Sequence, residues 1–109
     1  MKRADQLEQV KRIAALMRDR DLSRLSAASA QKAQTEQRLA ALDRTQTVPA
    51  LDAVISAQVV DRFGLWTTNR RILLNQKLAR ETVIWLAAKA QAQESFGRAD
   101  VLANLTSKR

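Results

Sequence analysis

The chain has 109 residues, of which 46% are apolar and only 4% aromatic, enough for one small domain with a thin core. It contains no cysteine and no histidine, which excludes disulfides, thiol chemistry and imidazole-based acid–base or metal chemistry. The net charge of +8 is spread over both halves of the chain and favours acidic protein surfaces, polyanions or anionic membranes as partners.

The first predicted element is a helix over about residues 4–44. Asp5 and Glu8 have the spacing of a capping box, and neither glycine nor proline interrupts the stretch that follows. The spacing of its apolar residues drifts between heptad and longer repeats, which argues against a strict zipper. Residues 26–33 have no large apolar side chain and form either a thin, alanine-lined seam or a zone where a partner competes. The predicted core stripe of this helix consists of Leu7, Val10, Ala14, Met17, Leu22, Leu25, Ser29, Ala33, Leu39 and Leu42.

Residues 45–49 are predicted to form a turn that ends at Pro49, the only proline. A connection this short makes the two flanking helices antiparallel neighbours. The second helix is predicted over about residues 50–105, and Gly64 leaves open a kink or break between Arg62 and Asn69. Its predicted core stripe consists of Leu51, Ile55, Val59, Phe63, Trp66, Leu73 or Leu74, Leu78, Trp85 and Phe96.

These elements predict an all-α protein: a single domain over residues 1–109, folded as an elongated, antiparallel two-helix hairpin or coiled coil. The longest apolar run, Val83–Ala88, is far shorter than the roughly 20 residues that a membrane span needs. No apolar signal segment follows the N-terminus, so we expect a soluble, cytoplasmic protein.

The sequence predicts no enzymatic activity, cofactor or metal, because it has no phosphate-binding glycine loop and its carboxylates are scattered. Asp19 and Asp21 alternate with arginines and are predicted to lie on a solvated face. Trp66 next to Arg70 could stack on nucleic-acid bases, but it fits the apolar stripe and is predicted to be buried. The candidate partner-binding residues are Arg18, Arg20, Arg24, Arg70 and Arg71, each with a purely solvated role as the alternative.

Two segments, Phe63–Ala79 and Glu94–Leu102, combine aromatic residues with spaced arginines and leucines. In this pattern the chain resembles FliJ-type proteins, the small coiled-coil components of the flagellar and related type III export apparatus. The resemblance implies a stalk that inserts into the ring of the export ATPase and also contacts the export gate and export chaperones. It also implies a position at the inner face of the bacterial membrane.

Three hypotheses for function follow. The first is a non-enzymatic scaffold or stalk in protein export, as the resemblance implies. The second is a basic helical adaptor that binds nucleic acid, although no DNA-reading element is recognisable. The third is a coiled coil that associates with itself.

Overall fold

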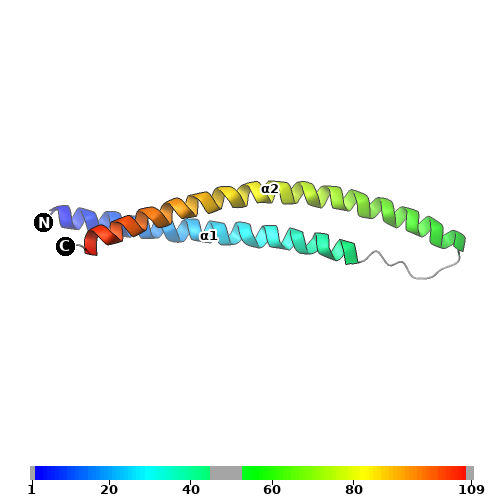
Figure 1. Ribbon diagram of the computed structural model, residues 1–109, viewed down its shortest axis with the longest axis horizontal. Coiled ribbons are helices and arrows are strands. Elements are labelled where there is room, and N and C mark those ends of the chain that lie inside the picture. Colours follow the sequence, from blue (N-terminus) through cyan, green and yellow to red (C-terminus); the bar gives the residue numbers. More distant parts are fainter. Residues whose placement is uncertain (1, 45–52, 108–109) are drawn as a thin grey trace. The chain divides into compact units, whose positions relative to one another are not determined.

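The computed structural model describes residues 2–44 and 53–107, and these form two long helices. Helix α1 is Lys2–Arg44 and helix α2 is Ala53–Ser107. The two helices are antiparallel and pack against each other (Figure 1), as predicted. The predicted turn at 45–49 and the positions 50–52, including Leu51, lie outside the described residues, as does the side chain of Ile55.

The start of α1 and the middle of α2 differ in detail from the sequence prediction. α1 begins at Lys2, so Asp5 lies in its first turn, where its negative charge complements the helix dipole, instead of capping the end. α2 is helical without interruption through Gly64, and neither Gly64 nor Gly97 has a positive φ. The helix therefore does not break between Arg62 and Asn69.

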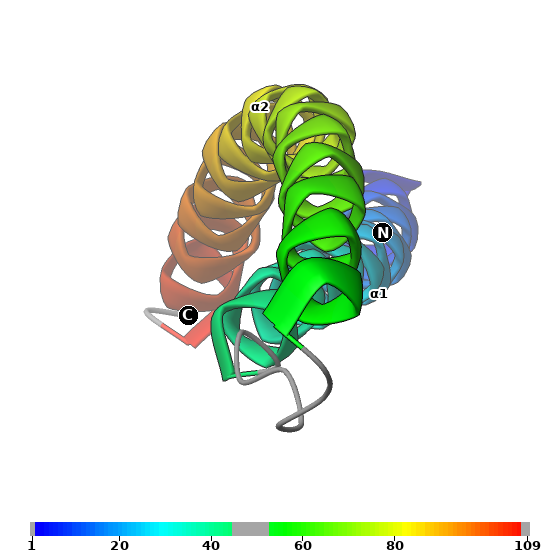
Figure 2. The same ribbon diagram turned by 90° about the vertical axis from the view of Figure 1, so that its right-hand side faces the viewer.

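The chain divides into two compact units, each made of paired segments of α1 and α2. In one unit, α1 up to Ala30 pairs with α2 from Val83 onward. The other unit is Gln31–Thr82, where the last part of α1 lies beside the first part of α2. Figure 2 shows the green start of α2 nearest the viewer, and Figure 1 shows that this start extends beyond the teal end of α1.

Burial between the helices recurs every seven residues, the period of a coiled coil. On α2, Thr67, Leu74 and Ser95 are buried at separations that are multiples of seven. The prediction of a drifting repeat was therefore wrong. The repeat is hidden in the sequence because polar or very small residues occupy many seam positions. On α1 the buried positions are Ala14, Asp21, Ala28, Thr35 and Leu42.

The predicted core stripes are partly confirmed. Ala14, Leu42 and Leu74 are buried, and a further set of predicted residues is half-buried: Leu7, Met17, Leu25, Ser29, Leu39, Phe63, Leu78 and Trp85. The prediction was wrong for other residues, because positions beside the seam rows turn away from the opposite helix. These exposed residues are Val10, Leu22, Ala33, Val59, Trp66 and Phe96. Of the two alternatives Leu73 and Leu74, the structure buries Leu74 and exposes Leu73.

Trp85 explains the small residues of the 26–33 segment. Its indole Nε1 donates a hydrogen bond to Ser29 Oγ at 2.9 Å, next to the buried Ala28. Small side chains on α1 leave room for this large ring, and Lys89 lies 5.2 Å from the ring centroid on α2. The structure thus favours the interpretation of this segment as a thin part of the seam.

Trp85→Ala should destabilise the protein by about 3 kcal/mol, at the low end for aromatic truncations because the side chain is half-buried. Trp66→Ala is the matched control. Trp66 is 55% exposed, so its loss should cost less than about 1 kcal/mol. Urea unfolding of the two variants measures both values. Equal destabilisation would contradict the placement of the two indoles.

Gly64→Ala should stabilise the protein by about 0.5–1 kcal/mol, because alanine loses less backbone entropy than glycine inside a helix. A Cβ built at Gly64 meets no atom within 4 Å, so no contact opposes the gain. Thermal unfolding followed by circular dichroism measures the change. A lower melting temperature would show that α2 needs the freedom of glycine at this position.

Candidate partner-binding groove

Most of the large apolar side chains described by the structure lie outside the seam between the helices. The buried apolar residues are three alanines with Leu42 and Leu74. By contrast, Leu65 is 67% exposed and Ile13 is 56% exposed, with many others like them. Where such side chains lie together on the surface of a protein, they mark an interaction site.

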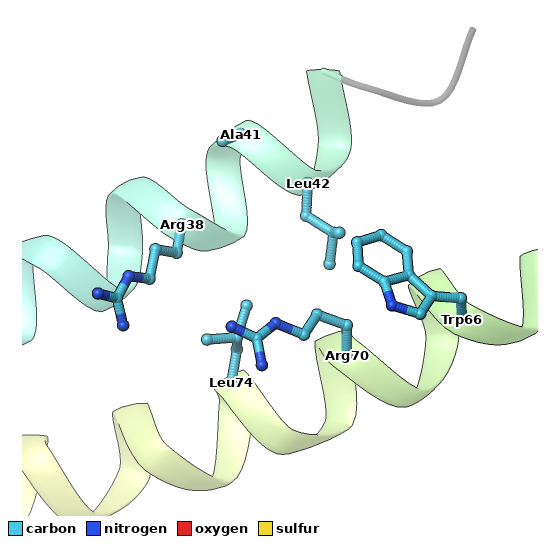
Figure 3. Close-up of a pocket in the computed structure, with 6 residues that line it drawn as sticks. All are labelled: Arg38, Ala41, Leu42, Trp66, Arg70 and Leu74. Atoms are coloured by element: carbon cyan, nitrogen blue, oxygen red, sulfur yellow. The ribbon is translucent and has the colours of Figure 1, made fainter. Parts of the chain in front are cut away.

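One groove combines exposed apolar surface with positive charge, and it lies within the Gln31–Thr82 unit. Its volume is about 310 Å³. Figure 3 shows Leu42 of α1 and Trp66 of α2 pointing toward each other, with the side chains of Arg38 and Arg70 extending into the space between the helices. The lining residues are Arg38, Ala41, Leu42, Trp66, Arg70 and Leu74.

Helical spacing brings these residues together. Trp66, Arg70 and Leu74 follow one another at intervals of four residues, so they share one face of α2. Arg38 and Leu42 have the same spacing on α1. Leu42 and Leu74 belong to the buried rows and form the floor of the groove, whereas Trp66 stands at its exposed edge.

The indole of Trp66 is supported from one side. It stacks on Phe63, with 5.9 Å between the ring centroids and 28° between the ring planes. Because such a pair restrains both rings, the indole presents its other surface to the groove without a large loss of side-chain entropy on binding.

The two arginines of the groove have no carboxylate partner within residues 2–44 and 53–107. A guanidinium carries five donors in a planar fork that fits a carboxylate. The groove therefore places two guanidinium groups beside an indole ring and two leucine side chains. This chemistry suits a partner segment that places a carboxylate next to an apolar side chain.

Of the five arginines predicted to bind partners, only Arg70 lines the groove. Arg71 forms an ion pair across the seam, with its Nη2 2.5 Å from Asp43 Oδ1. Arg18 pairs with Asp19 at 3.4 Å and also lies 5.9 Å from the centroid of the Phe96 ring.

The remaining two predicted arginines converge on one carboxylate. Arg20 Nε lies 3.1 Å and Arg24 Nη1 3.9 Å from Asp21 Oδ1.

The sequence analysis did not predict Arg38 as a partner-binding residue. The sequence shows that Arg38 and Leu42 are four residues apart and so share a helix face. The position of Arg38 across from Arg70 depends on the register of the two helices, which the sequence does not show.

The prediction that Asp21 lies on a solvated face was wrong, because its side chain is buried in the seam between the helices. The hydroxyl of Ser95, on α2, donates a hydrogen bond to Asp21 Oδ2. This bond lowers the pKa of the Asp21 carboxyl, and Arg20 and Arg24 lower it further, while burial opposes them. The carboxylate thus ties α1 to α2 in its charged form.

A lowered pKa makes this contact sensitive to acid. Its stabilisation is complete above the ordinary pKa of 3.8 and is lost as the pH falls through the lower folded-state value. Ser95→Ala should therefore reduce the melting temperature near pH 7 and make the further loss in strong acid smaller than in the wild type. The exposed Ser23→Ala is the control. Parallel melting curves for the wild type and Ser95→Ala variant over the acid range would contradict the role of this contact.

Among the described residues, no group of three or more acidic side chains is placed to hold a metal ion. No described helix has an apolar stretch long enough to cross a membrane. Comparison of the chain with known protein families, with curated proteins and with solved structures finds no match.

Proposed function

We propose that this protein is a non-enzymatic helical scaffold that binds a partner protein through the groove at Trp66. The observation that carries the proposal is an exposed indole beside two guanidinium groups, Arg38 and Arg70, that have no carboxylate partner among the described residues. The partner segment supplies an acidic residue to the arginines and an apolar side chain to Trp66 and the leucine floor. The net charge of +8 assists the approach of an acidic surface.

The resemblance to FliJ-type proteins suggests the identity of the partner. We propose that it is the ATPase of a type III protein-export apparatus, with the export gate and export chaperones as further partners. The two-helix hairpin and the basic surface support this proposal, because a stalk inside a ring contacts its partner through helix faces. The proposal places the protein in the cytoplasm, at the inner face of the membrane.

Trp66→Ala should weaken binding to the purified export ATPase of the same organism by about tenfold or more, as expected for an aromatic anchor. Arg70→Ala should weaken it as well, because the partner carboxylate loses its donor. Arg80→Ala, an exposed arginine on α2 outside the groove, is the control and should leave the affinity unchanged. Surface plasmon resonance at physiological salt measures the dissociation constants.

Full affinity in the Trp66→Ala variant would contradict the groove as the binding site, and absence of binding in the wild type would contradict the proposed partner. The exposed indole beside two arginines also favours nucleic acid as a second candidate ligand. Fluorescence anisotropy with a labelled single-stranded oligonucleotide separates the two candidates. Salt-dependent binding that Trp66→Ala abolishes would support the nucleic-acid adaptor instead.

A further inference from the structure

α2 carries a second row of regularly spaced residues that contains no charged side chain. In the Gln31–Thr82 unit this row is exposed, and its members alternate at intervals of four and three residues. The same spacing, counted along α2, continues into the other unit. We define the outer row as Leu65, Asn69, Ile72, Gln76, Ala79, Val83, Leu86, Ala90 and Gln93.

In the Gln31–Thr82 unit, the outer row faces away from α1. Leu65 and Ile72 each precede a buried seam residue, Thr67 and Leu74, by two positions, which is about 200° around a helix. The seam row includes the charged Arg71 and Glu81, whereas the outer row has none. The outer row therefore has fewer charged residues to oppose helix pairing than the seam between α1 and α2 has.

Part of the outer row has the residue types of a parallel, two-stranded coiled coil. In heptad order, the d positions are Leu65, Ile72, Ala79, Leu86 and Gln93, and the a positions are Asn69, Gln76, Val83 and Ala90. Leucine at d with a β-branched residue at a favours two parallel strands, and a single asparagine at a fixes their register. In-register pairing places Asn69 against Asn69 of the other strand, so each side-chain amide has a partner.

We propose that the outer row is a dimerisation surface, along which α2 pairs in parallel and in register with α2 of a second copy of this chain. Charge supports a second copy as the occupant. Two chains of net charge +8 repel each other, and the uncharged outer row lets them approach without placing cations in contact.

The large side chains of the outer row are available for contact. Leu65 and Val83 are each 67% exposed, and Ile72 and Leu86 are 50% and 52% exposed. From Leu65 to Gln93 the outer row spans about 40 Å of helix.

The test is the mass of the full chain in solution, measured by sedimentation equilibrium over a range of concentrations. The wild type should approach twice its mass of 12.2 kDa. Ile72→Glu should raise the dimer dissociation constant by about tenfold or more, because two carboxylates replace two apolar contacts. Ile84→Glu is the matched control, being the same residue type on the same helix, 60% exposed against 50% for Ile72.

Ile84 lies about 120° around α2 from Ile72, so its substitution should leave the dimer intact. Circular dichroism confirms that both variants stay helical. A monomeric mass at every concentration would overturn the proposal. An equal effect of both substitutions would also overturn it, because the contact would not follow the outer row.

A cysteine placed in the row tests the orientation, since the natural chain has no cysteine to interfere. Asn69→Cys brings two thiols together in a parallel, in-register dimer, and an added oxidant should join them in a disulfide. Ser23→Cys, an exposed position on α1, is the control and should stay monomeric on a denaturing gel. Absence of the linked dimer for Asn69→Cys would overturn the parallel register.

Discussion

Two antiparallel helices bury only the side chains that point into the space between them, and in this protein those positions recur every seven residues. Whatever residue stands at such a position enters the seam, whether apolar or not. Asp21 and Ser95 do so as a hydrogen-bonded pair, and Trp85 does so against the small residues around Ser29. Most of the other large apolar side chains that the structure describes are exposed.

This constraint explains why many large apolar side chains are exposed while polar and small residues are buried in the seam. A two-helix pair cannot enclose a core, so stability depends strongly on contacts made by the outer faces. The groove at Trp66 and the outer row of α2 are two different consequences. The groove joins an aromatic ring to two arginines and suits an acidic segment, whereas the outer row is uncharged and suits a second copy of the chain.

The two surfaces do not exclude each other. The groove takes residues from both helices, and the outer row belongs to α2 alone on the side away from α1. We therefore propose a scaffold whose α2 pairs with a second α2 while each copy keeps its groove for a partner. Such a dimer offers two binding sites, and a partner with repeated subunits gains avidity from both.

The sequence by itself determined the two helices, because residues 2–44 contain no glycine or proline and the single proline separates the two stretches. It also indicated Arg70 as a binding candidate. Only the tertiary structure decided the rest: Arg38 beside Arg70, Asp21 inside the seam and Trp66 outside it. The physical reason is register. A helix that is apolar on several sides can pack through any of them, and a shift of the partner helix changes which residues are buried, so spacing along one helix cannot choose among its faces.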